Sequence, residues 1–265
     1  MSVYLRALPD IARVSFARLI AYRAEMAIWI LTAMLPLVML ALWNTVVADE
    51  AVAGFGPQAV GRYFVAALVV RQLTGAWLVW QLNGEIRTGA LSAQLLRPVH
   101  PLFVDAVWMF TALPLRLVIL SPVVAAVLLW RPDLLALPSP TALLLFIPSV
   151  LMAWALEFMV QGIFGMLAFW LDRSEGLYGI WLGLWLVLSG YIAPLAVFPE
   201  WAQAALAWLP FRSMLAVPVE LLGGFLTPQQ AMVDLARQGM WVAIFALLTA
   251  AMWRRGLARY GAFGA

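Results

Sequence analysis

Three ionisable side chains stand near the middle of long apolar runs: Arg71, Arg116 and Glu157. An unpaired charge at the centre of a bilayer costs about 3 kcal/mol, so such residues either pair with one another or line a path for a solute. We expect Glu157 to pair with Arg116 or Arg71, which would fix helix packing. Because two cations accompany one anion, a path for an anionic or amphipathic solute stays open as a second interpretation. Further hydrogen bonds could come from Gln72, Gln161 and Ser121.

Other kinds of chemistry find little support in the residue types. The chain has no cysteine and a single histidine, His100, which excludes thiolate chemistry, disulfides and a histidine metal cluster within one chain. No set of nucleophile, base and orienting residue is visible, so catalysis is the least favoured class. The net charge is only +3 and the arginines form no single block, which argues against nucleic-acid binding.

The composition indicates that the bilayer is the main solvent of this chain. Of its 265 residues, 65% are hydrophobic and only 11% are charged, and the mean hydropathy is +0.96. A helix needs roughly 20 apolar residues to cross the hydrocarbon. The runs do not alternate as barrel strands would, so we predict an all-α polytopic membrane protein, a single domain over 1–265. The six predicted spans cover about 26–47, 61–82, 103–130, 141–170, 177–197 and 238–253.

The distribution of arginine predicts the orientation of these spans. If the N-terminus is cytoplasmic, most arginines outside the spans fall on the inner side, and an even number of spans returns the C-terminus there. Residues 1–25 carry arginines at spacings of five to seven with apolar residues between them. This pattern is typical of an amphipathic helix lying in the membrane interface. A charged leader without a helix is the alternative.

Small residues at helical spacing predict close contacts between helices. Gly179 and Gly183 form a G-x-x-x-G pair in the fifth predicted span, and Gly162 and Gly165 lie close together in the fourth. Because the motif is common by chance in apolar sequence, it is weak evidence for a dimer interface.

The segment 83–100 is a compact polar stretch between two strongly apolar runs, and the predicted orientation makes it the first cytoplasmic loop. Asn83 could cap a helix start, and Pro98 would stop one. Apolar residues at helical spacing predict a short helix lying flat at the membrane surface. An ordinary loop that obeys the positive-inside rule is the alternative. The residues we expect to matter are Glu85, Arg87, Leu91, Leu95, Leu96 and Arg97.

The outer segment 198–236 follows a series of helix breakers. Trp201 and Trp208 lie at helical spacing between Pro199 and Pro210, which predicts a short interfacial or re-entrant helix after the fifth span. A simple extracellular loop with a surface helix is the alternative. The candidate outer gate consists of Pro194, Pro199, Trp201, Trp208 and Pro210.

Two motifs resemble a known family. The pattern E-I-R-x-G-x-L-S-x-x-L-L-R-P-x-x-P, from Glu85 to Pro101, is similar to the loop between spans two and three in permease subunits of type-2 ABC exporters. The order P-x-x-x-F-P, L-P-F-R and P-x-x-x-L-x-G within 189–224 resembles the segment after span five of the same permeases. The resemblance covers nearly the whole chain and is closest to a less characterised six-span branch.

The resemblance implies a function for both segments. The loop 83–100 would carry a coupling helix seated in a groove of a cytoplasmic ABC ATPase, and the outer segment would cap the exit of the pathway. ATP and Mg²⁺ would bind to that partner ATPase, and a second permease, identical or related, would complete the pathway. The chain would lie in a bacterial inner or plasma membrane with both termini cytoplasmic, and its surroundings would be membrane lipid.

Two other functional classes stay open. An autonomous ion-coupled secondary transporter would need a carboxylate near the membrane midplane, and Glu157 is the intramembrane candidate. It would also need internal repeats, and no clear repeat is visible. A membrane scaffold that transports nothing is the third class.

The missing phosphate loop leads to the first prediction. The sequence contains no G-x-x-x-x-G-K-[ST] motif, so the chain cannot cradle ATP by itself. Purified chain in detergent, supplied with ATP and Mg²⁺, should release phosphate no faster than the same buffer without protein. Turnover of nucleotide in the absence of any partner would contradict the assignment.

Overall fold

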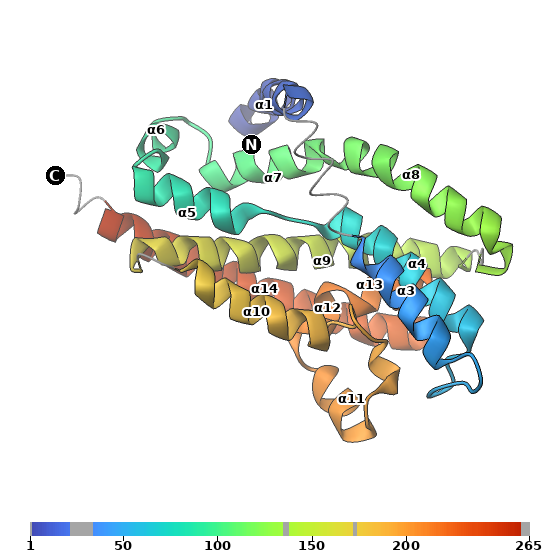
Figure 1. The fold of residues 1–265 in the computed structure, drawn as a ribbon. Helices are drawn as coiled ribbons and strands as arrows, with labels where there is room; N and C mark the ends of the chain where they lie inside the picture. Colours follow the sequence, from blue (N-terminus) through green and yellow to red (C-terminus); the bar gives the residue numbers. More distant parts are fainter. Residues whose placement is uncertain (1, 22–33, 135–137, 172–173, 261–265) are drawn as a thin grey trace.

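A computed structural model describes residues 2–21, 34–134, 138–171 and 174–260, and these residues form an all-α protein without strands (Figure 1). This confirms the predicted fold class. The first helices are α1 (Ser2–Ala21), α3 (Leu35–Val46), α4 (Pro57–Thr74), α5 (Leu78–Thr88), α6 (Leu91–Leu95), α7 (Pro101–Thr111) and α8 (Leu113–Trp130). The later ones are α9 (Pro140–Met166), α10 (Glu175–Leu188), α11 (Glu200–Leu206), α12 (Pro210–Met214), α13 (Ala216–Leu222) and α14 (Pro228–Tyr260).

Four helical stretches of the described chain are long and apolar enough to cross a membrane: Pro57–Thr88, Pro101–Trp130, Pro140–Phe169 and Pro228–Tyr260. They correspond to predicted spans two, three, four and six. Two shorter apolar helices, α3 and α10, correspond to spans one and five. Residues 26–33 of the first predicted span lie outside the described residues.

The helical boundaries differ from the predicted ones at several places. Span five was predicted to run to 197, but α10 ends at Leu188 because Gly190 has a positive φ of 88°. Span six is much longer than the predicted 238–253, since α14 has 33 residues. Span three divides into α7 and α8 just before Pro114, a residue without a backbone N–H to continue the helix.

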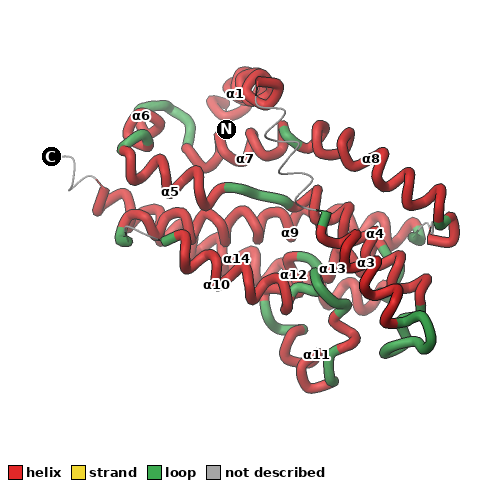
Figure 2. Tube along the Cα trace, in the orientation of Figure 1, coloured by secondary structure: helices red, strands yellow, loops and turns green. Residues whose placement is uncertain are grey.

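Span two is also broken, which the sequence interpretation did not foresee. α4 ends at Thr74, residues 75–77 are non-helical, and α5 begins at Leu78. Figure 2 shows this stretch as a loop segment between two helices within the bundle. Gly75 adopts φ −57° and ψ 128°, an extended conformation that ends the helical ladder.

The two ends of the bundle are marked by contacts between connecting segments. At one end, Asn83 donates a hydrogen bond to Ser174 (2.6 Å), and Ser92 and Tyr260 share one of 3.0 Å. At the other end, the Gln58 amide donates to the backbone carbonyl of Asp133 at 2.9 Å. The segment 83–100, the start of α10 and the end of α14 therefore lie together, as the alternating six-span order requires (Figure 1).

α9 is the central helix, and it packs against α4, α5, α12, α13 and α14. Its small residues allow a close approach of α5: a Cβ added at Gly165 would lie 3.1 Å from the Cβ of Leu82. A Cβ at Gly162 would lie 3.3 Å from a methyl of Leu78. This confirms the close contact predicted for this pair, whereas Gly179 and Gly183 have no neighbour within 4 Å in the described chain.

The N-terminal helix lies across the bundle, where Figure 1 shows it end-on above α7. Tyr4 contacts Phe103 edge-to-face at 5.1 Å, and the buried Leu19 packs with Ala112 and Trp77. Arg6 and Arg13 are exposed. So are many apolar side chains of α1, namely Val3, Tyr4, Leu5, Leu8, Val14, Phe16 and Ile20. The helix itself is confirmed over Ser2–Ala21, and its position in the membrane interface stays a prediction.

The close contact between α5 and α9 yields a stability test. In Gly165→Ala the new methyl would meet the Val79 carbonyl oxygen at 3.2 Å, and a backbone atom cannot move aside cheaply. Overpacking of this kind costs about 1–3 kcal/mol, so the melting temperature in detergent should fall by about 5 °C.

Gly183→Ala is the matched control, because it lies in an apolar helix and its Cβ would meet nothing within 4 Å. Its melting temperature should stay the same or rise, since alanine favours helix over glycine. Equal shifts for the two variants would argue against the α5–α9 contact.

Candidate functional site

The break in span two exposes backbone carbonyls that the helix no longer uses. Arg116 of α8 donates through Nη1 to the carbonyls of Gln72 (3.3 Å) and Gly75 (2.7 Å). Gln161 of α9 donates from Nε2 to the Ala76 carbonyl at 2.7 Å. Irregular backbone at membrane depth persists only where such groups are satisfied by protein or water. Two side chains from neighbouring helices therefore satisfy the backbone carbonyls that the break leaves unpaired.

Contacts of α9 show where this break lies along the bundle. Ser149 of α9 bonds to Gln238 of α14 at 2.9 Å, toward the end of the bundle where Gln238 also meets α12. Gln161 is twelve residues further along α9, about 18 Å on a helix axis. Beyond it, Phe169 meets Trp253 edge-to-face at 6.4 Å near the opposite end. The break therefore lies between the two ends, inside the stretch that we assign to the membrane.

The intramembrane charges are arranged only partly as predicted. Glu157 forms its ion pair with Arg71, at 3.9 Å, and not with Arg116. Gln161 adds the predicted hydrogen bond to Glu157 at 3.0 Å. Ser121 does not take part, since it is exposed and donates to the carbonyl of Val118. Helix register decides which arginine pairs with Glu157, because it places the Arg116 guanidinium beside the free carbonyls of the break.

A cavity of about 230 Å³ adjoins the break. Both arginines line it, Arg71 with its guanidinium 5.1 Å from the ring centroid of Trp185 and Arg116 at 4.3 Å from that of Trp77. The remaining lining is mainly aromatic and aliphatic: Leu35, Gln72, Gly75, Ala76, Trp80, Tyr178, Leu182, Leu186 and Tyr191. The sequence interpretation named both arginines but not the aromatic residues, which come from the break itself, from α5 and α10, and from the segment after α10.

The segment 83–100 differs in local structure from its prediction. Asn83 does not cap a helix start, because α5 begins at the break in span two and Asn83 is already inside it, buried and bonded to Ser174. α5 ends at Thr88 and is capped by Gly89, whose φ of 78° suits glycine. The short helix α6 follows over Leu91–Leu95, and α7 begins at Pro101.

The six residues predicted to couple to an ATPase are not all presented outward. Leu91 is buried, and Glu85 is half-buried and accepts a hydrogen bond from Gln81 at 3.2 Å. The apolar residues of the segment, which were predicted to lie on one side of a short helix, therefore do not share one face, because Leu91 packs inward whereas Leu96 is 88% exposed. The outward-facing members of the set are Arg87, Leu95, Leu96 and Arg97.

The same segment is joined to the end of α14. Besides the Ser92–Tyr260 bond, the His100 ring lies 4.7 Å from that of Trp253. His100 Nδ1 accepts a hydrogen bond from the Leu102 N–H at 3.2 Å and so caps α7. Partial burial lowers the pKa of His100 below its usual 6.5, which favours the neutral ring that this acceptor role requires.

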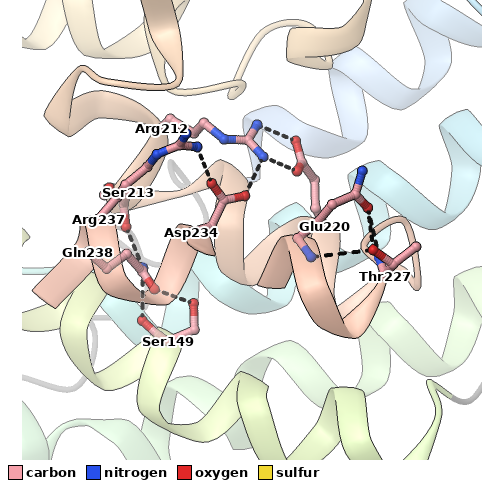
Figure 3. Close-up of polar contacts among 9 residues, drawn as sticks. Ser149, Arg212, Ser213, Glu220, Thr227, Asp234, Arg237 and Gln238 are labelled. Atoms are coloured by element: carbon pink, nitrogen blue, oxygen red, sulfur yellow. Dashed lines mark hydrogen bonds and ion pairs between the residues drawn. The ribbon is translucent and has the colours of Figure 1, made fainter. Parts of the chain in front are cut away.

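A network of four charges, which the sequence interpretation missed, joins the outer segment to α14 (Figure 3). Arg212 of α12 donates to both oxygens of Glu220 (2.9 and 2.7 Å) and to Asp234 (2.9 Å). Arg237 donates to the other Asp234 oxygen at 2.9 Å. Separately from these charges, Gln238 of α14 donates to the Ser213 carbonyl of α12 at 2.8 Å. The sequence gives little sign of this network, since Arg212 and Asp234 are 22 positions apart and only the fold brings them together.

The predicted outer gate residues fall into an exposed group and a buried group. α11 forms between Pro199 and Pro210 as expected, with Trp201 77% exposed and Trp208 60% exposed. Pro210 begins the buried helix α12. The segment that inserts into the bundle is therefore α12–α13, while α11 projects from it (Figure 1). Pro194 precedes a short 3-10 turn, Leu195–Val197, beside a cavity of about 670 Å³ that is also lined by the charge network.

Together these features define a polytopic helical membrane protein with a broken span, an inner connecting segment and an inserted outer segment. Residues 27–264 match the family described as ABC-2 family transporter protein, and the chain belongs to this family. It is therefore the membrane component of a transporter, a multi-pass subunit that is not itself an ATPase. A search among curated proteins found no match to the chain.

The outer network generates a further prediction. Asp234 joins two arginines and its side chain is only 7% exposed. Asp234→Asn would leave Glu220 as the one anion beside Arg212 and Arg237, which should lower the free energy of unfolding by about 3 kcal/mol. Thermal unfolding in detergent, followed by tryptophan fluorescence, measures this loss.

Asp133→Asn is the control, because it removes the same charge from an exposed pair with Arg131. Surface pairs contribute little, so its melting temperature should stay close to that of the wild type. If both variants unfold at the same temperature, the network does not stabilise the outer segment.

Proposed function

We propose that the chain is the permease subunit of an ATP-driven ABC exporter. In this proposal an ABC ATPase, which binds ATP and Mg²⁺, grips the segment 83–100 on the cytoplasmic side. Motion of the ATPase then opens and closes a pathway between two permeases, identical or related. The observation that carries the proposal is the outward presentation of Arg87, Leu95, Leu96 and Arg97 on a segment tied to the membrane helices, in a chain of this family.

The attachment of that segment supports a rigid-body relay. Ser92 and His100 contact Tyr260 and Trp253, both near the inner end of α14. α14 is one unbroken helix of 33 residues, and it also carries Asp234 of the outer network. A displacement of the inner segment is therefore passed along one stiff helix, the kind of movement by which packed elements transmit a switch.

The outer segment is suited to act as the gate of the pathway. Arg212 of α12 bonds to Asp234 of α14, so movement of α14 pulls on the inserted helices. Trp208 is held by the Arg237 guanidinium, 4.7 Å from its ring centroid, and its carbonyl accepts a bond from Trp241. We propose that Pro194 and Pro199 set the bends and that Trp201 and Trp208 lie at the outer surface of the gate.

The membrane placement follows from the charge distribution. The inner segments hold most of the arginines outside the spans, which favours both termini in the cytoplasm. The resemblance to type-2 ABC permeases is the ground for proposing a bacterial cell membrane. The contacts of Glu157 with Arg71 and Gln161 favour a packing role for this carboxylate over ion coupling. They therefore weigh against the autonomous secondary transporter.

The inner segment provides the test. We expect Arg87→Ala combined with Arg97→Ala to remove two exposed cations that an ATPase groove would contact. The amount of ABC ATPase that co-purifies with the tagged chain should fall about tenfold, because charged and apolar anchors dominate such interfaces.

The matched control is Arg254→Ala combined with Arg255→Ala, which removes two exposed cations near the same end but outside the segment. It should retain the ATPase at the wild-type level. Equal retention by both double variants, or equal loss, would contradict the proposed coupling role of 83–100.

A further inference from the structure

The cavity beside the break in span two has an unusual balance of charge. Two guanidinium groups line it, those of Arg71 and Arg116. Arg71 forms an ion pair with the carboxylate of Glu157 at the long distance of 3.9 Å. Arg116 forms no ion pair with any residue that the structure describes, although it is only 1% exposed. Among the residues that the structure describes, the cavity therefore carries one positive charge without a counter-charge.

The hydrogen bonds of Arg116 are incomplete in a specific way. Its Nη1 is occupied by the two backbone carbonyls of the break, and its flat face lies over Trp77. Its Nε and Nη2 are covered from solvent and have no hydrogen-bond partner in the described chain. This is the edge of a guanidinium that receives a carboxylate or phosphate through two parallel bonds. A buried donor pair without acceptors is costly at this depth, and a bound anion would remove that cost.

The walls of the cavity favour an amphiphile over a free ion. Trp80, Tyr178 and Trp185 lie around the charged pair, and Leu182 and Leu186 of α10 complete the apolar side. Trp80 is 44% exposed and meets the buried Tyr178 edge-to-face at 5.5 Å, so Trp80 stands at the edge of the bundle. A volume of about 230 Å³ accommodates a headgroup but not a long chain, which would have to extend between helices into lipid.

We propose that this cavity binds the anionic headgroup, phosphate or carboxylate, of a membrane-held amphiphile. The Nε–Nη2 edge of Arg116 receives two oxygens of the headgroup, Arg71 supplies the second positive charge, and the aromatic residues contact the first carbons of the tail. This inference rests on the proposed transport function and names its substrate class. The sequence interpretation left open a path for an anionic or amphipathic solute. The present proposal is more specific, because it names the Nε–Nη2 edge of Arg116 as the group that binds the headgroup.

The test measures binding to the purified full-length chain in non-ionic detergent, without any ATPase. The probes are dodecyl phosphate, dodecanoate, dodecyltrimethylammonium and inorganic phosphate, followed by calorimetry and by the shift in melting temperature. Dodecyl phosphate and dodecanoate should bind, whereas the cationic amphiphile and inorganic phosphate should not. Equal binding of the cationic probe would overturn the assignment of charge, and equal binding of inorganic phosphate would show a free-anion site instead.

Two variants test the site by different means. Arg116→Lys keeps the charge but removes the two-pronged edge, and Leu186→Trp fills the cavity without touching either arginine. Each should weaken dodecyl phosphate binding at least tenfold, while Arg131→Gln, at an exposed arginine, should not. If Arg116→Lys does not fold, Leu186→Trp alone decides, and unchanged affinity there would overturn the proposal. Failure here with normal ATPase co-purification would leave the transport function standing, so the two proposals fail separately.

Discussion

The structure depends on satisfying the backbone where span two is interrupted. Lipid offers no partner to the carbonyls of Gln72, Gly75 and Ala76, so the break exists only because Arg116 and Gln161 reach them from neighbouring helices. Because Arg116 donates its hydrogen bonds to the carbonyls of the break, Glu157 forms its ion pair with Arg71 instead. It also restarts the helix at Leu78, which carries α5 as far as Thr88 and sets the position of the inner segment.

The two ends of the molecule are connected through a small number of stiff elements. α9 forms the centre, and close packing at Gly162 and Gly165 holds α5 against it. α14 runs the full length, with the inner segment bonded to Tyr260 and the outer helices bonded to Asp234. Since the outer network pairs two cations with two anions, it joins α12, α13 and α14 without leaving an excess of charge. These links make a mechanical relay between the ends physically reasonable.

Particular residues show where prediction from sequence succeeds and fails. The helix between Pro199 and Pro210 was predictable, since its breakers and tryptophans are local signals. The close approach at Gly165 was also predictable from the small side chain. Asn83 was assigned to a helix start because a polar residue after an apolar run resembles a cap, yet the true helix start is set by the break before it. The Arg212 network was missed because Arg212 and Asp234 are far apart in sequence, and only the insertion of α12 and α13 brings them together.

The sequence by itself determined that this is an all-α membrane protein, where most of its spans lie, and which motifs relate it to the ABC-2 transporters. These properties follow from hydrophobic run length, the distribution of arginine and local breakers, all of which act over a few residues. Only the tertiary structure decided the partner of each buried charge, the break in span two and the cavity beside it. The reason is that a polar group in a membrane takes whichever partner its neighbouring helices bring within reach, and that depends on helix register, which no local pattern specifies.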